Sequence, residues 1–218
     1  IFKKKYSISH EELYPSVAIL DGSLSLTLPV NTSIITILDA LSHSFEAIWN
    51  KNANSQSTDF SISAICSILQ NVSSLKQNPL DLGIRNNLLE AATIAGLAFS
   101  NTTTAAAHSI SYPLTIRYGI PHGIASSISL IPLLEINRKS IKVQLDEICN
   151  LNQITYQELE DNIKAIPQNI IPYKLNKWSI PKNQLKRLAI ESFTKGRMDN
   201  NIVDLTNEDV YDILLSIY

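Results

Sequence analysis

The stretch Asn31–Asn50, NTSIITILDALSHSFEAIWN, decides the fold class of this chain. Its first three residues, Asn31, Thr32 and Ser33, carry side-chain oxygens that can cap a helix N-terminus. Apolar side chains then recur at spacings of three and four residues, which places them on one helical face: Ile34, Leu38, Leu41, Phe45 and Ile48. The stretch therefore predicts an amphipathic helix whose apolar face needs partners.

The rest of the chain continues the helical pattern. Pro113, Gly119 and Pro121 predict one loop that interrupts it. The segment 124–136 is almost wholly apolar and is expected to be buried. Further helices are predicted from near Thr58, over 80–100, 102–111 and 124–136, after a capping box at Thr155, over 181–194, and from Thr206. The sequence thus predicts a mainly α protein, a bundle of seven or eight helices without an internal repeat.

One strand is predicted before the helices. Ser16–Leu20, SVAIL, reads as a buried strand that ends in the turn Asp21-Gly22. A single strand needs a sheet, and no convincing partner strand follows. The chain is therefore expected to be the C-terminal part of something larger.

Composition excludes several classes of protein. Of the 218 residues, 44% are hydrophobic and 17% charged, which suffices for a sizeable core. The net charge of −2 argues against a general nucleic-acid binder. No apolar run reaches the ~20 residues that a membrane span needs. The two cysteines, Cys66 and Cys149, form no disulfide framework and fit a reducing cytosol.

Asp39 and His43 are four residues apart in LDALSH. Both side chains therefore leave the same face of the predicted helix. A carboxylate and an imidazole placed in this way can share one metal ion. Taken alone, the pair is explained more simply by a local hydrogen bond between the two side chains.

Two more histidines lie in apolar surroundings. His108, in TAAAHSISYP, has small neighbours that leave room around its ring, and His122, in YGIPHG, opens a predicted buried helix. Each alone fits a core or capping histidine. With Asp39 and His43 they supply one carboxylate and three imidazoles, a complete ligand set for a divalent transition metal. Imidazole suits iron and zinc alike, so the ligand types leave the metal open.

A metal site of this kind polarises a carbonyl or alcohol oxygen but supplies no hydride. Hydride transfer needs a nicotinamide cofactor, whose usual fingerprint is a Gly-rich turn between a strand and a helix. The sequence contains neither GxGxxG nor a P-loop, and its six glycines are spread along the chain. No cofactor-binding residue is therefore assigned.

Three segments together resemble the C-terminal half of the iron-containing (group III) alcohol dehydrogenases. They are DALSHSFEAIW (39–49), RNNLLEAATIAGLAFSNTTTAAAHSISYPL (85–114) and YGIPHGIA (118–125), and they include the 14-residue spacing of the last two histidines. The resemblance runs from about Pro15 to the end. It implies that 1–24 end an N-terminal α/β nucleotide-binding domain, mostly absent here, and that 25–218 form an all-helical metal-binding catalytic domain.

The resemblance also implies a function and its cofactors. Asp39, His43, His108 and His122 are the implied ligands of Fe(II) or Zn(II), while NAD(H) or NADP(H) binds mainly to the missing domain. The implied protein is a cytoplasmic, NAD(P)-linked alcohol dehydrogenase or aldehyde reductase for a small molecule, a homodimer or larger. It contacts neither nucleic acid nor membrane, and this part of it alone is expected to be inactive.

Many family members carry a further histidine four residues after the third ligand, where this chain has Tyr112. Tyr112 is the predicted catalytic residue, because its hydroxyl can donate a hydrogen bond to an alkoxide. Its ordinary pKa near 10 makes it a poor base at neutral pH.

The segments HSISYPLT and GRMDN resemble most the phosphonoacetaldehyde reductases, which form 2-hydroxyethylphosphonate. A buried anion requires cationic partners. The candidates are Arg117, Lys195 and Arg197, each of which is otherwise explained as a solvated surface cation.

Two alternatives share the implied fold. One is a zinc-dependent enzyme similar to glycerol dehydrogenase. The other is a dehydroquinate synthase, which is disfavoured because no set of Lys and Arg surrounds the histidines. A third alternative belongs to another class: if the chain is a whole gene product, the missing cofactor fingerprint favours a non-catalytic, helical metal-binding module.

Overall fold

The structure, a computed structural model, describes residues 10–218 and confirms the helical fold class. The described residues contain no strand and a single isolated antiparallel bridge, between Asn50 and Asn201. Their α-helices are α1 (Val30–Ile48), α2 (Ser55–Gln77), α3 (Leu82–Thr102), α4 (Ala106–Tyr118), α5 (His122–Ser127), α6 (Leu130–Asn137), α7 (Lys142–Asn152), α8 (Tyr156–Ala165), α9 (Leu185–Glu191) and α10 (Asn207–Ser216). The predicted seven or eight helices are thus too few for this part of the chain.

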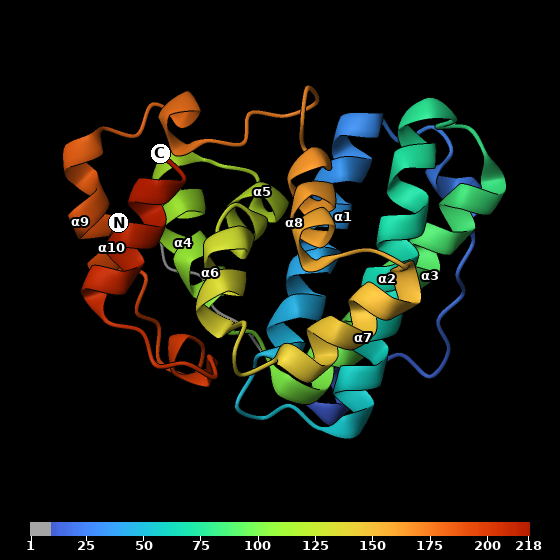
Figure 1. Ribbon diagram of the computed structural model, residues 1–218. Helices are drawn as coiled ribbons and strands as arrows, with labels where there is room; N and C mark the ends of the chain where they lie inside the picture. The colour runs from blue at the N-terminus through green and yellow to red at the C-terminus, as the bar shows by residue number, and fades with distance from the viewer. Residues whose placement is uncertain (1–9) are drawn as a thin grey trace.

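Helix α1 runs through the middle of the molecule, with α2 and α3 on one side and α4, α5, α9 and α10 on the other (Figure 1). All five members of its predicted apolar stripe are buried. The predicted caps lie inside the first turn instead, because α1 begins at Val30 after Pro29 and has no side-chain cap. Packing on both sides therefore holds α1, and it needs no capping bond.

Helices α2 and α3 begin at side-chain caps. The Asn54 side chain accepts a hydrogen bond from the Ser57 backbone N–H, and the Asn54 backbone N–H donates one to the Ser57 hydroxyl. With this cap, α2 starts three residues before the predicted Thr58. Asp81 accepts a bond from the backbone of Ile84 at the start of α3.

The prediction of a loop at Pro113 is wrong. Pro113 lies buried inside α4, which runs past the predicted end of the 102–111 helix to Tyr118. A proline inside a helix costs about 3 kcal/mol, so tertiary burial of α4 outweighs the local penalty. Gly119 ends the helix in the left-handed conformation, at φ +66°.

The predicted helix over 124–136 is two helices, α5 and α6. They separate because Pro132, which has no N–H, occupies the first turn of α6, where backbone N–H groups lack intrahelical partners. The predicted burial is confirmed for most of the segment.

The C-terminal third matches the prediction in part. Thr155 and Thr206 form the capping boxes of α8 and α10. The segment 181–194 is shorter than predicted, with a 3₁₀ turn at Lys182–Gln184 before α9. Helix α7 was not predicted, because it buries just two side chains, Leu145 and Ile148.

The predicted strand Ser16–Leu20 is also wrong. Its residues form no regular structure, and Val17 and Ile19 are 75% and 87% exposed. A strand requires a hydrogen-bonded partner, and the described residues offer none. The following 3₁₀ turn, Gly22–Ser25, packs on α3 through a bond from the Gly22 N–H to Asn86. Residues 1–9 of the predicted 1–24 segment lie outside the described part.

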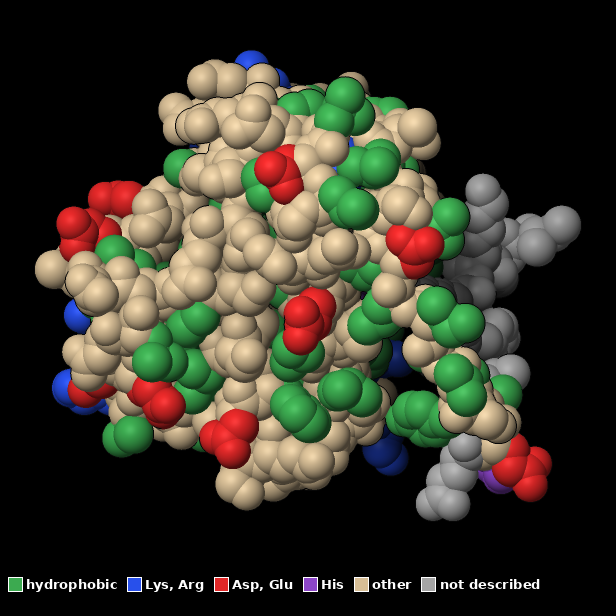
Figure 2. All heavy atoms as spheres, turned by 90° about the vertical axis from the view of Figure 1, so that its right-hand side faces the viewer, with side chains coloured by type: hydrophobic (Ala, Val, Ile, Leu, Met, Phe, Trp, Pro, Cys, Tyr) green, Lys and Arg blue, Asp and Glu red, His purple; other side chains and the backbone are tan. Residues whose placement is uncertain are grey.

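Two features of the described residues concern helix length and surface charge. Within residues 10–218, no helix is long and apolar enough to cross a membrane. The face shown in Figure 2 carries scattered acidic side chains and few Lys or Arg side chains.

Candidate functional site

Asp39 is the centre of a cluster that three separate helices supply. His43 follows it by one turn on α1, with 3.8 Å between His43 Nε2 and Asp39 Oδ2. His108 of α4 places its Nε2 3.5 Å from Asp39 Oδ1, and His122, the first residue of α5, places its Nε2 3.8 Å from the same oxygen. The four residues singled out in the sequence therefore lie around one point.

Ring packing fixes the orientation of the imidazoles. His43 lies between Phe99 of α3 and His108, with ring centroids 4.1 Å and 4.3 Å away and nearly parallel planes. His108 meets His122 edge to face, at 5.2 Å. The rings therefore have little freedom to turn away from Asp39.

Two polar side chains support this cluster. Ser126, four residues after His122, donates a hydrogen bond of 2.7 Å to Asp39 Oδ1. Glu46, fully buried on α1, accepts a 3.0 Å bond from the backbone N–H of His108 and lies 2.5 Å from its ring Nδ1. Asp39 and His108 are thus each held by a contact outside the cluster itself.

The cluster has the chemistry of a metal site. Asp39, His43 and His108 each offer a ligand atom, and these atoms lie within 4.8 Å of one another. The Nε2 atom of His108 is buried, faces Asp39 and has no hydrogen-bond partner among the described residues. A buried polar atom without a partner is costly, and a metal ion would satisfy it. Imidazole and carboxylate ligands suit a divalent transition metal.

The electrostatic environment shifts the pKa values of His43 and His108 in opposite directions. Burial, with the nearby His108, lowers the pKa of His43 to about 4. Burial opposes the charged form of His108 too, but Glu46 and Asp39 outweigh it and raise the pKa of His108 to about 9. Burial likewise opposes ionisation of the two carboxyl groups, yet the neighbouring histidines lower the pKa of both. At neutral pH the carboxylates are therefore ionised.

Tyr112 lies one turn after His108 on α4 and is half-buried. Burial raises its pKa, against the opposing effect of Arg197. The Arg197 guanidinium lies 5.3 Å from the centre of the Tyr112 ring and donates a hydrogen bond to Thr104. Tyr112 is therefore protonated at neutral pH and beside a cation.

The other two predicted substrate-binding cations lie elsewhere. Arg117 forms an ion pair with Glu191 at the surface. It follows His108 by nine residues, which places it about half a helical turn away, on the opposite face of α4. Lys195 is exposed and lines a surface cavity with Phe193 and Asp199. The structure thus brings Arg197 next to Tyr112.

Sequence reasoning missed Glu46 and Ser126. Glu46 had a signal, because it lies seven residues after Asp39 and three after His43, on the same face of α1, among apolar neighbours. Ser126 had none that distinguishes it from Ser127, the other serine of α5.

The profile described as "Fe-containing alcohol dehydrogenase family, C-terminal" matches residues 33–218. Long-chain-alcohol dehydrogenase 1 of Geobacillus thermodenitrificans is 27% identical over 201 residues, covering 88% of this chain and 51% of that protein.

Solved structures show the same architecture. Sulfoacetaldehyde reductase from Bifidobacterium kashiwanohense, in complex with NAD+, has a TM-score of 0.87 at 26% identity, over 96% of this chain and 56% of its own. An iron-containing alcohol dehydrogenase from Thermococcus thioreducens has a TM-score of 0.84 at 26% identity, over 97% and 57%. The chain spans about half the length of these relatives.

Proposed function

Since the chain belongs to the Fe-containing alcohol dehydrogenase family, we propose that it is the metal-binding catalytic half of an NAD(P)-linked alcohol dehydrogenase or aldehyde reductase. The observation that carries the proposal is the convergence of three histidines, from three helices, on Asp39. The family and its relatives do not favour a glycerol dehydrogenase or a non-catalytic module.

Asp39, His43, His108 and His122 would hold Fe(II) or Zn(II). When bound, such an ion polarises the carbonyl or alcohol oxygen of a substrate. Ser126 keeps one oxygen of Asp39 in place through its hydrogen bond, and Phe99 fixes the plane of the His43 ring. These contacts preorganise the ligands and so lower the cost of binding the ion.

Tyr112 would act on the same substrate oxygen. It keeps its proton at neutral pH because burial raises its pKa. It can therefore donate a hydrogen bond to a developing alkoxide but cannot serve as a base. The hydride itself would come from NAD(H) or NADP(H), which we propose binds mainly to residues outside this chain.

For the substrate, we propose an aldehyde with an anionic head group, such as phosphonoacetaldehyde. Arg197, beside Tyr112, is the cation that would pair with that group. The similarity to an enzyme named for sulfoacetaldehyde, another two-carbon aldehyde with an anionic group, supports this substrate class.

Removing the Arg197 charge should separate anionic from neutral substrates. In the full-length enzyme, we expect Arg197→Gln to lower kcat/KM for phosphonoacetaldehyde about 10- to 100-fold, the loss of one charge-assisted hydrogen bond. The rate with acetaldehyde should change little. Arg117→Gln, at the surface pair with Glu191, is the matched control. Equal losses on both aldehydes would contradict the proposed anion contact.

The metal proposal is tested by stoichiometry. After anaerobic loading with Fe(II) or Zn(II) and desalting, mass spectrometry should find about one metal ion per chain, and none in Asp39→Ala. Asp204→Ala removes an exposed carboxylate that pairs with Lys51, so it should retain the ion. A wild-type chain without retained metal would overturn the proposal.

A further inference from the structure

We propose that Glu46 is a positioning residue of the metal site: its two carboxylate oxygens together hold the His108 ring with Nε2 directed at Asp39. Because it concerns a metal ligand, this inference rests on the proposed function. It assigns a role to a residue that lies outside the set of ligands.

The carboxylate of Glu46, on α1, contacts α4 through one residue, His108. One oxygen accepts from the backbone N–H of His108 at 3.0 Å, and the other lies 2.5 Å from the ring Nδ1. Glu46 is on α1 and fully buried, while His108 is the third residue of α4. Water therefore does not compete for either contact.

The backbone contact replaces a missing cap. The first backbone N–H groups of a helix have no intrahelical partner, and Ala105, before α4, has no side chain that can accept from them. Glu46 supplies that acceptor from another helix. Its negative charge also lies at the positive end of the helix dipole. The same residue thus fixes both the position of α4 and the ring that α4 carries.

The ring contact selects one tautomer of His108. A neutral imidazole has one protonated nitrogen, and that nitrogen cannot bind a metal. A carboxylate at Nδ1 favours the proton there. In the metal-bound ring, which is neutral, Nε2 is then the nitrogen left to bind the ion, and it already faces the site, 3.5 Å from Asp39 Oδ1. Carboxylates placed in this way orient metal-binding histidines in proteins, and their loss typically costs 10- to 100-fold in metal affinity.

The backbone N–H and the ring Nδ1–H of His108 each need an acceptor. The side chain of glutamine has one acceptor oxygen, whereas that of glutamate has two. In Glu46→Gln, a carbonyl oxygen that keeps the backbone bond turns the amide N–H₂ toward Nδ1, which favours the tautomer protonated at Nε2. The opposite orientation sets the amide N–H₂ against the backbone N–H, a buried contact between two donors. Either orientation breaks one contact, although glutamine matches glutamate in size.

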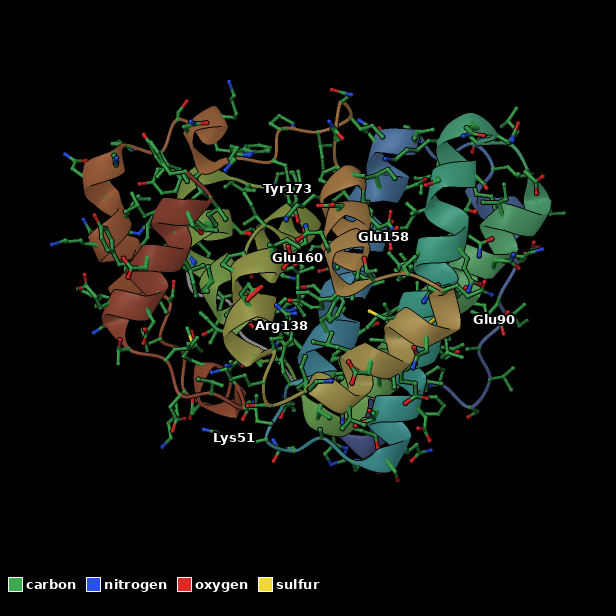
Figure 3. The ribbon with its side chains drawn as sticks, in the orientation of Figure 1. Lys51, Glu90, Arg138, Glu158, Glu160 and Tyr173 are labelled. Carbon is green, nitrogen blue, oxygen red and sulfur yellow. The ribbon has the colours of Figure 1, made fainter. Side chains whose placement is uncertain are left out.

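The test compares metal affinity in the 218-residue chain. Competition titration with Zn(II) should show Glu46→Gln binding about 10- to 100-fold more weakly than wild type. The matched control is Glu160→Gln on α8 (Figure 3), which removes another buried carboxylate, one that pairs with Lys164. That variant should bind Zn(II) as wild type does. Unchanged affinity in folded Glu46→Gln would overturn the inference.

A second readout uses the wild-type protein and does not depend on how the variant folds. In the Zn(II)-loaded chain, ¹⁵N-resolved NMR should show His108 protonated at Nδ1 and unprotonated at Nε2. The reverse tautomer would overturn the inference even if Zn(II) binds. A wild-type chain that binds no Zn(II) overturns the proposed function instead, so the two failures are distinguishable.

Discussion

Gly123→Ala should destabilise the protein and weaken metal binding, although it adds one methyl group and replaces none of the proposed ligands. A Cβ at Gly123 would lie 2.1 Å from the backbone carbonyl oxygen of Ile35 and 3.0 Å from two further atoms of that residue. Neither side can give way easily, because both belong to packed helices, α5 and α1. We expect a loss of at least about 1–3 kcal/mol in the free energy of unfolding, the range for overpacked cores.

The effect on the metal site follows from the position of Gly123 in α5. To accommodate the methyl group, α5 must move away from α1. The helix carries His122 on one side of the glycine and Ser126 on the other, and both approach Asp39. A shift of α5 therefore withdraws a ligand and the hydrogen bond that holds the carboxylate. Zn(II) titration should show weaker binding even where the variant is fully folded.

Gly96→Ala is the matched control for this prediction. Gly96 lies inside α3, and a Cβ there would meet no atom within 4 Å. Alanine is favoured over glycine in a helix interior by about 1 kcal/mol. Urea unfolding should therefore show Gly96→Ala to be slightly more stable, with unchanged metal affinity. Equal stability of Gly123→Ala and wild type would contradict the close approach of α5 to α1.

The sequence predicts what depends on local periodicity. The apolar stripe of α1 and the capping boxes at Thr155 and Thr206 were readable because spacing alone defines them. The placement of Asp39 and His43 on one face follows from the same rule. The structure adds that His108 and His122 lie close to Asp39 and His43. That these four residues bind a metal ion stays a prediction.

Features that depend on tertiary contacts were not readable. A proline usually breaks a helix. Helix α4 continues through Pro113 because most of its residues are buried, which local sequence does not show. The strand predicted at Ser16–Leu20 failed for the opposite reason, because its apolar residues find no partner among the described residues. Nothing in the sequence around Gly123 shows that a side chain is excluded there, because the excluding contact comes from Ile35 on another helix. The contact between Glu46 and His108 joins residues 62 positions apart.

His108→Ala should have two separable consequences. It removes a proposed metal ligand, so the chain should no longer retain Fe(II) or Zn(II). It also leaves Glu46 fully buried without its ring partner. Breaking a buried charged pair from one side typically costs about 3–5 kcal/mol. Urea unfolding with a chelator present should show His108→Ala to be less stable than wild type by this amount, because the cost of the unpaired Glu46 does not depend on metal.

Adding metal separates the two consequences. Zn(II) at 100 times its dissociation constant should raise the wild-type free energy of unfolding by about 2.7 kcal/mol, since it binds the folded state. It should leave His108→Ala unchanged. The control His10→Ala removes an exposed histidine and should respond to Zn(II) as wild type does. Stabilisation of His108→Ala by Zn(II) to the wild-type extent would contradict the role of His108 as a ligand.

A double variant tests the origin of the metal-independent loss. If the cost in His108→Ala arises from an unpaired buried carboxylate, removing that carboxylate as well should recover part of it. Well-packed apolar residues often replace a buried charged pair at little cost. We therefore expect Glu46→Leu combined with His108→Leu to unfold at higher urea than His108→Ala, yet to bind no metal. A double variant less stable than His108→Ala would show that the two side chains stabilise the fold by packing more than by their mutual contact.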